Sequence, residues 1–194
     1  FADEINRAPA KVQSALLEVM QEKQVTLGDE TFKLEPPFFV MATQNPVEQE
    51  GVYQLPEAQL DRFMLKLVVD YNSKDEELEI ARRISSGNFE DIQAVVSKDD
   101  IDELKKQIKD VHVDAEVEEY MIELVNATRN PNEYGLEELT DFIQFGASPR
   151  VSIDMFKAVK AMAFMREKGF VTPVDVAYIA KELMRHRIVL TYEA

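Results

Sequence analysis

The sequence has 194 residues, of which 45% are hydrophobic and 30% charged, so it is long enough to bury the core of one large domain or two small ones. Its 22 basic and 37 acidic residues give a formal net charge of −15, which disfavours non-specific binding to nucleic-acid phosphates. The absence of cysteine excludes disulfides and cysteine-ligated metals, and two histidines are too few for a histidine-rich metal site. Without a recognisable signal peptide or an apolar run near the roughly 18 residues of a membrane helix, we expect a cytoplasmic protein with no membrane segment.

The acidic residues are concentrated in the middle of the sequence. Residues 1–73 have a net charge of −6, residues 74–149 of −12 and residues 150–194 of +3. We interpret the acidic middle as solvated helix faces. The basic part begins at Arg150, and it is the part of the sequence best suited to an anionic partner.

The first third of the sequence predicts a mixture of helix and strand. Residues 8–22 place apolar side chains on one helical stripe, and residues 24–34 predict a β-hairpin whose turn is Gly28-Asp29. The run 38–42, which follows two prolines, is continuously apolar, as is the run 64–69. Such runs are typical of strands that are buried on both faces of a parallel sheet.

Helices account for most of the remaining sequence. Their starts carry recognisable signals, such as Ser97 with Asp100, which resembles a capping box. The predicted helices span residues 56–61, 74–86, 97–109, 114–128, 149–168 and 172–184. The sequence therefore predicts an α/β region over residues 1–72 and an all-α region over residues 73–194.

Two of the predicted buried strands end in residues that can carry chemistry. Asp3 and Glu4 follow the apolar Phe1-Ala2, and Asn45 follows the run 38–42. Open parallel sheets bind ligands beyond the carboxyl ends of their strands, so these side chains meet there if the strands are neighbours. One carboxylate can then hold Mg²⁺, the other can polarise a water and the amide can orient it, as in a P-loop ATPase. On these residues alone, a turn or a helix cap is the more common role.

Four stretches of the sequence together resemble the MoxR family of AAA+ ATPases. They are FADEINRAPAKVQSALLEVMQE, ATQNPVEQEGVYQLPEAQLDRFMLKL, GASPR and TPVDVAYIAKELMRHRIVLTYEA. The resemblance covers almost the whole sequence in order and is weakest across residues 85–135. It implies the C-terminal half of an AAA+ parallel-sheet core over residues 1–72, followed by a helical lid domain over residues 73–194. The hairpin 24–34 resembles the pre-sensor-1 hairpin that faces the ring pore.

The resemblance also implies a role for each of five side chains, with ATP and Mg²⁺ as cofactors. FADE resembles a Walker B motif, which implies that Asp3 is the Mg²⁺ ligand and Glu4 the base that activates water. Asn45 occupies the sensor-1 position. Arg62 occupies the position of the arginine finger, which points into the ATP of the neighbouring subunit. Arg150 occupies the sensor-2 position at the start of a lid helix, where it can act in its own subunit or in the next.

Other roles are open to these residues when each is taken alone. A surface ion pair is the more common role for an arginine such as Arg62. Arg150 stands at a predicted helix N-terminus, where a cation is mildly unfavourable, and this favours an anionic partner. Asn6 and Arg7 suit a structural role, pairing with a neighbouring acid or capping the next helix. His186 suits a helix face better than a ligand site.

The phosphate-binding loop of the family, G-x-x-x-x-G-K-[ST], has no counterpart in the sequence. None of the six glycines is followed by Lys and then Ser or Thr, so the backbone cradle and the lysine for the phosphates are missing. Because the sequence also opens with Phe1, we expect a fragment that by itself neither binds ATP tightly nor hydrolyses it. An interrupted parallel sheet leaves an unpaired edge, so we expect self-association or local rearrangement around residues 1–22.

The leading hypothesis for function is a ring, expected to be a hexamer, that hydrolyses ATP to remodel or activate client proteins, among them proteins with von Willebrand factor A domains. A second hypothesis is a nucleic-acid motor related to the minichromosome-maintenance helicases. Their pore hairpins are basic, whereas the hairpin here sets Lys33 against Asp29 and Glu30, so no nucleic-acid partner is expected. A third hypothesis is a non-catalytic helical interaction module.

Overall fold

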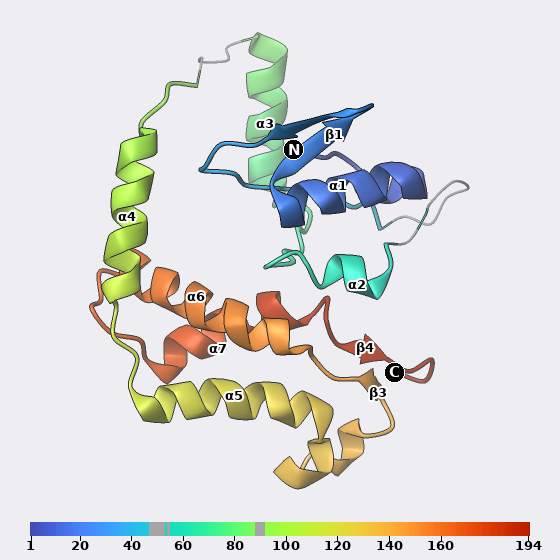
Figure 1. Cartoon of the computed structure of the whole chain (residues 1–194), viewed down its shortest axis with the longest axis vertical. Helices are drawn as coiled ribbons and strands as arrows, with labels where there is room; N and C mark the ends of the chain where they lie inside the picture. The colour runs from blue at the N-terminus through green and yellow to red at the C-terminus, as the bar shows by residue number, and fades with distance from the viewer. Residues whose placement is uncertain (47–52, 54, 88–91) are drawn as a thin grey trace.

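The computed structural model describes residues 1–46, 53, 55–87 and 92–194 (Figure 1). Its α-helices are α1 (Ala10–Glu22), α2 (Glu57–Leu60), α3 (Lys74–Ser86), α4 (Lys98–Asp110), α5 (Ala115–Arg129), α6 (Pro149–Met165) and α7 (Pro173–Met184). Its short 3-10 helices are η1 (Ile5–Arg7), η2 (Pro131–Tyr134) and η3 (Glu137–Leu139). Its strands are β1 (Gln24–Leu27), β2 (Glu30–Lys33), β3 (Ile143–Phe145) and β4 (Val189–Leu190).

The helix and the hairpin predicted near the N-terminus are both present. α1 begins after Pro9, whose fixed φ suits the entry to a helix. β1 and β2 pair antiparallel, with Leu27 opposite Glu30, and Gly28 turns the chain between them at a φ of +63°. This left-handed conformation costs glycine little, because it has no Cβ.

The two buried strands predicted from apolar runs are wrong for this chain. In the run 38–42, only Ala42 forms a bridge, parallel to Ala2, and Phe39 keeps 81% of its surface exposed. The run 64–69 has no strand, and its apolar side chains are likewise exposed. Apolar runs form buried strands only when neighbouring strands and covering helices are supplied, and the described part of the chain does not supply them.

The hydrophobic core lies among the C-terminal helices. Met121 of α5, Met155 of α6 and Leu183 of α7 are fully buried, and valines at the same faces surround them. Figure 1 shows α5, α6 and α7 packed side by side in the lower part of the view. The stripe predicted for residues 114–128 is confirmed, because Val117 and Val125 face this core together with Met121.

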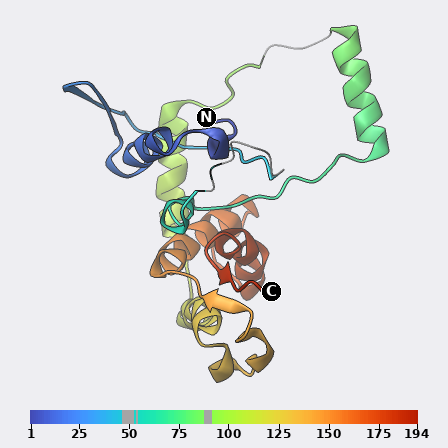
Figure 2. The same cartoon turned by 90° about the vertical axis from the view of Figure 1, so that its right-hand side faces the viewer.

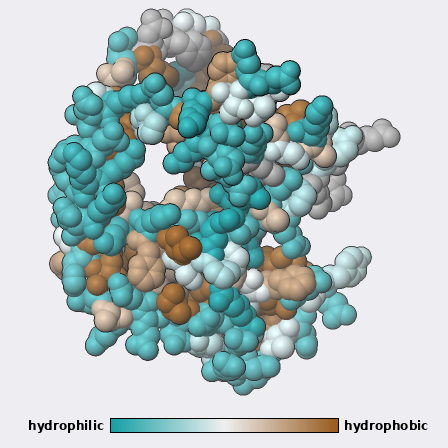
Figure 3. Space-filling model, in the orientation of Figure 1, coloured by the Kyte–Doolittle hydropathy of each residue, from teal (hydrophilic) through white to brown (hydrophobic). Residues whose placement is uncertain are grey.

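The acidic helices α3 and α4 contribute no buried residue. Each begins at a capping box, and in α4 the side-chain and backbone groups of Ser97 hydrogen-bond Asp100 and lower the pKa of its carboxyl. α3 stands apart from the other helices in Figure 2, and α4 presents a mainly hydrophilic surface in Figure 3. Among the described residues, no helix combines the length and the apolar composition required to cross a membrane.

Gly146 allows a close approach that sets the start of α6. A Cβ at this position would lie 2.4 Å from the backbone oxygen of Thr128, a distance that no real Cβ tolerates. The next residue, Ala147, accepts a hydrogen bond from Nε of Arg129 at 2.7 Å and donates one to Oγ1 of Thr128 at 2.9 Å. The glycine of the GASPR stretch therefore lets the end of α5 hold the first turn of α6, where Arg150 lies.

Asp175 is a fully buried carboxylate that ties the start of α7 to the end of α6. Its oxygens accept hydrogen bonds from the backbone and hydroxyl of Thr172, from Arg166 and from Lys168. Burial alone would raise the pKa of Asp175, but the hydrogen bonds from Thr172, Lys168 and Arg166 outweigh it and lower the pKa to about 2.

We expect Asp175→Asn to lower the free energy of unfolding by about 2.5 kcal/mol at neutral pH, the equivalent of this pKa shift. Because the pKa is lower in the folded state than in the unfolded state, the contribution is present above about pH 4. It disappears as the pH falls towards about 2. Denaturant unfolding between pH 2 and pH 7 checks this, with the exposed Asp141→Asn as control. A loss in Asp175→Asn that does not shrink at low pH contradicts the assignment.

Candidate functional site

The structure brings together the three residues that were predicted to share one edge of the sheet. The backbone nitrogen of Ala2 donates to the Met41 carbonyl and that of Thr43 donates to the Ala2 carbonyl, each at 2.9 Å. This pairing fixes the register of the two segments. As a result, Nδ2 of Asn45 donates to Oε1 of Glu4 at 3.1 Å, although the residues are 41 positions apart in the sequence. Asp3 lies beside them and is exposed to solvent.

Thr43 links the two acidic residues and was not singled out from the sequence. Its hydroxyl donates to Oδ1 of Asp3 at 2.5 Å and accepts from the backbone nitrogen of Glu4 at 2.8 Å. The signal was present, because Thr43 directly follows the apolar run as Asn45 does. The hydroxyl therefore orients one carboxylate and fixes the backbone of the other.

Asn6 and Arg7 support this group, in agreement with the structural role expected for them. Asn6 is buried, and its amide donates to the Asn45 carbonyl at 2.8 Å and accepts from the Asn45 nitrogen at 3.3 Å. Nε of Arg7 lies 2.8 Å from Oε2 of Glu4. The Glu4 carboxylate is thus held on one oxygen by an amide and on the other by a guanidinium.

The backbone at Glu4 is in the left-handed region, with a φ of 44° and a ψ of 52°. This conformation is uncommon for a residue other than glycine, asparagine or aspartate. It is held by the hydrogen bond to Thr43 and by that from Ile5 to the Thr43 carbonyl. Residues kept in such conformations by their surroundings cluster at functional sites.

The donor set of this group fits a magnesium ion that is also bound by a nucleotide. Asp3 offers an exposed carboxylate, and Mg²⁺ typically takes one or two carboxylates with phosphate and water oxygens as its remaining ligands. The described residues contain no cluster of three or more potential metal-ligating side chains. A magnesium ion held by Asp3 would therefore take most of its ligands from phosphate and water oxygens.

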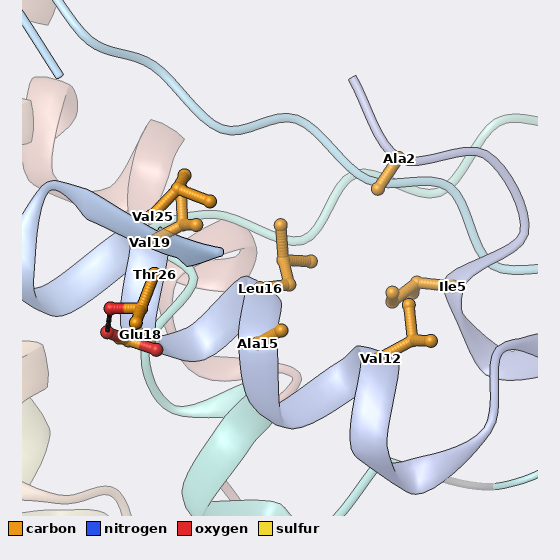
Figure 4. Close-up of a pocket in the computed structure, with 9 residues that line it drawn as sticks. All are labelled: Ala2, Ile5, Val12, Ala15, Leu16, Glu18, Val19, Val25 and Thr26. Carbon is orange, nitrogen blue, oxygen red and sulfur yellow. Dashed lines mark hydrogen bonds between the residues drawn. The ribbon is translucent and has the colours of Figure 1, made fainter. Parts of the chain in front are cut away.

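A hollow of about 280 Å³ adjoins the group but does not suit a nucleotide. Figure 4 shows it between α1, β1 and the N-terminal segment, with Leu16, Val19 and Val25 among its apolar lining. The polar side chains that line it are Glu18 and Thr26, which hydrogen-bond each other at 3.0 Å. Phosphates require positive charge or backbone amides, and this lining offers neither.

The two candidate arginines lie in a second group, around the segment that follows α2. Nε of Arg62 donates to the Ala58 carbonyl at 3.2 Å. Nη1 of Arg150 lies 3.1 Å from Oδ2 of Asp61, and the hydroxyl of Ser148 donates to Oδ1 of the same carboxylate at 2.7 Å. Asp61 pairs with Arg150, and the ion pair considered for Arg62 is not seen among the described contacts.

Arg187 is a functional candidate that was not singled out from the sequence, and His186 lies beside it. The helix-face role expected for His186 is wrong, because the imidazole is buried beyond the end of α7 and donates from Nε2 to the Phe63 carbonyl at 2.8 Å. Burial lowers the pKa of His186, and Arg187 lowers it further. The buried stripe of α7, continued four residues past Leu183, reaches Arg187, so the sequence did contain a signal for its burial.

Two family models match the chain. The model of the ATPase family associated with various cellular activities (AAA) matches residues 1–65, and that of the AAA lid domain matches residues 139–194. The first match contains Asp3, Glu4, Asn45 and Arg62, and the second contains Arg150. A further stretch of the first match, residues 47–52 and 54, lies outside the described residues.

Curated relatives match over essentially the whole chain. Chaperone MoxR1 of Mycobacterium tuberculosis is 47% identical over 194 residues, which are all of this chain and 51% of the relative. Protein YeaC of Bacillus subtilis is 44% identical and is covered to 58%. Protein MoxR of Paracoccus denitrificans is 28% identical over 98% of this chain. The chain thus spans between half and three-fifths of the length of these relatives.

A solved structure shares the fold. The crystal structure of a protein from Cytophaga hutchinsonii assigned as an ATPase is 54% identical, with a TM-score of 0.93. The match covers 100% of this chain and 59% of that one. The expected fold class, part of an α/β ATPase core with a hairpin followed by a helical lid, is confirmed by this match together with the two family models.

Proposed function

Because the chain belongs to the MoxR family of AAA+ ATPases, we propose that it is the C-terminal part of a protein that hydrolyses ATP. In this proposal, residues 1–72 are the partial core and residues 73–194 the helical lid. The observation that carries it is the hydrogen bond between Asn45 and Glu4 beside the exposed Asp3. We refer to the proposed complete protein, with a phosphate-binding loop, as the longer protein.

The first group of residues supplies the hydrolytic chemistry in this proposal. Asp3 would hold Mg²⁺, which when bound would neutralise charge on the phosphates. Glu4 accepts the proton of the attacking water, and the Asn45 amide orients that water without adding a negative charge. Arg7, which pairs with Glu4, holds the carboxylate in place for this role.

The two arginines of the second group complete the site in an assembly. We propose that Arg62 reaches the ATP of a neighbouring subunit, which requires a ring, and we expect a hexamer. Arg150 contacts nucleotide from the lid, in its own subunit or the next. Negative charge develops on the phosphate oxygens in the transition state of phosphoryl transfer, and arginine side chains that can move towards it stabilise it.

The work driven by hydrolysis is proposed to be the remodelling or activation of client proteins in the cytoplasm, including proteins with von Willebrand factor A domains. The name of one relative, Chaperone MoxR1, supports this choice. A nucleic-acid motor is disfavoured, because the hairpin sets Lys33 against Asp29 and Glu30. The test is Mg²⁺-dependent ATP turnover by the longer protein, stimulated by a client. Absence of turnover in the assembled protein contradicts the proposal.

The 194-residue chain alone is expected to bind MgATP weakly and to hydrolyse none. The reason is that it lacks the G-x-x-x-x-G-K-[ST] loop, whose backbone amides and lysine supply most phosphate contacts. Isothermal titration calorimetry and a phosphate-release assay check this. Micromolar MgATP binding by the chain would show that another phosphate site exists and would contradict the expectation.

A further inference from the structure

Arg187 is a buried cation that joins the segment after α2 to the two helices α6 and α7. Its side chain is fully buried, and Nη2 lies 2.9 Å from the carbonyl oxygens of both Asp61 and Phe63. The same nitrogen lies 2.6 Å from Oδ2 of Asp154 on α6. Nη1 donates back to the Leu183 carbonyl at 3.4 Å. One guanidinium therefore contacts three parts of the chain that are far apart in sequence.

The two carbonyl groups that Arg187 binds are those on either side of Arg62. The Phe63 carbonyl also accepts from Nε2 of His186, so two consecutive residues beyond α7 hold the same oxygen. The segment continues along α7, because the backbone nitrogen of Lys66 donates to the Glu182 carbonyl at 2.9 Å. The backbone of Arg62 is consequently fixed to the end of α7 from both sides.

The side chain of Asp61 attaches the same segment to the start of α6. It accepts from Ser148 and Arg150, and its Oδ1 lies 3.2 Å from Nε of Arg187, although that contact is not aligned as a hydrogen bond. Asp154 supplies the second negative charge. The cluster therefore balances two arginines with two aspartates, which is the condition for burying a guanidinium at moderate cost.

From these contacts we infer that Arg187 is a positioning residue, which couples the backbone at Arg62 to α6 and α7. The inference rests on the proposed function, because it gives Arg62 its role in hydrolysis. A movement of the two helices then carries Arg62 with it, while the side chain of Arg62 stays free of the cluster. Arg150 belongs to the same cluster because it contacts Asp61. A displacement of α6 and α7 therefore moves both arginines of the second group.

Lysine cannot replace Arg187 in this role. A lysine ammonium is a compact charge on a flexible stem and cannot bind two carbonyls and a carboxylate with a planar fork. Arg187→Lys keeps the buried charge, which avoids leaving Asp154 without its cation. The matched control is Arg185→Lys on the same helix end. In the described part of the chain, the side chain of Arg185 contacts Glu182 and the Lys181 carbonyl, both within its own turn.

Hydrogen exchange in the 194-residue chain tests the coupling without requiring activity. The amides of Arg62 and Phe63 donate to the Gln59 and Leu60 carbonyls, so their exchange reports on this segment. We expect Arg187→Lys to speed their exchange about tenfold or more, with amides in α5 unchanged. Unchanged exchange at Arg62 and Phe63, or equal acceleration throughout the chain, overturns the inference.

A second variant guards against a misfolded protein. Arg187→Gln combined with Asp154→Asn removes both charges of the buried pair, so no unpaired ion is left inside. The same local acceleration is expected, because the double variant also lacks the guanidinium fork. Restored protection at Arg62 in this variant overturns the inference, since it would show that the fork is not required.

Kinetics of the longer protein separate this inference from the proposed function. We expect Arg187→Lys to lower kcat for ATP about tenfold or more and to leave KM within about twofold. This is the pattern expected when a group that acts in the transition state is misplaced. Unchanged kcat together with faster local exchange overturns the coupling to hydrolysis. Absence of turnover in the unmodified longer protein contradicts the proposed function instead, and hydrogen exchange still decides whether Arg187 holds the segment.

Discussion

Arg62→Ala in the longer protein is expected to lower kcat for ATP hydrolysis by about 10³–10⁵-fold, the range that arginine fingers contribute. The residue fits this role because its backbone is anchored on both sides, by the contacts of Arg187 with the Asp61 and Phe63 carbonyls. Its guanidinium makes one described hydrogen bond, to the Ala58 carbonyl. An anchored backbone with a lightly held side chain can reach a neighbour without rearranging the fold.

Steady-state kinetics with purified assemblies measure this effect, with the exposed Lys66→Ala as the control for loss of a nearby cation. Mixing decides whether the arginine acts between subunits. Rings made from Arg62→Ala and Glu4→Gln subunits contain some interfaces with an intact Arg62 beside an intact Glu4, so the mixture should regain part of the turnover. If mixing restores nothing while mixed rings form, Arg62 does not act on its neighbour.

The helices could be predicted because their signals are local. Ser97 with Asp100 and Thr172 with Asp175 form capping boxes that define where α4 and α7 start. The stripes of α5 and α7 then define which side chains enter the core. The runs 38–42 and 64–69 were mispredicted because a strand depends on its partners. Their apolar composition requires neighbours that the described part of the chain does not contain.

The first group of site residues could be predicted from topology and the second could not. Asp3, Glu4 and Asn45 follow strand-like segments, and parallel pairing brings such positions together. The contacts of Arg187 with Asp61 and Asp154 span up to 126 residues and join three segments, so no periodic pattern encodes them. Pattern reasoning places a residue on a face, but it does not say which backbone carbonyl lies opposite.

Asp61 links the two arginines of the second group. Its carboxylate accepts hydrogen bonds from Ser148 and Arg150 at the start of α6, and its backbone carbonyl accepts one from Arg187. Asp61 also directly precedes Arg62 in the sequence. If Arg150 turned towards a nucleotide, it would leave Asp61, and the cluster that holds the backbone of Arg62 would lose one contact. Nucleotide contact at the lid and placement of Arg62 are therefore expected to be energetically coupled.

Glu4→Gln is expected to lower kcat in the longer protein by about 10²–10⁴-fold, because a general base contributes about this factor. The substitution keeps the shape of the side chain, and the amide oxygen can still accept from Asn45, so the register around Thr43 is retained. ATP binding should change little, because Glu4 is assigned to the water and Asp3 to the metal. Glu22→Gln at the exposed end of α1 is the matched control.

Turnover and nucleotide affinity must be measured on the same preparation, since only their combination distinguishes a base from a structural residue. A loss of kcat with unchanged ATP affinity fits a base that is held between Asn45 and Arg7. Equal losses of kcat and of ATP affinity would indicate that Glu4 maintains the structure of the site and is not the base. Unchanged turnover would mean that the left-handed backbone at Glu4 and its two side-chain contacts serve the local structure, and the assignment of the hydrolytic site would then fail.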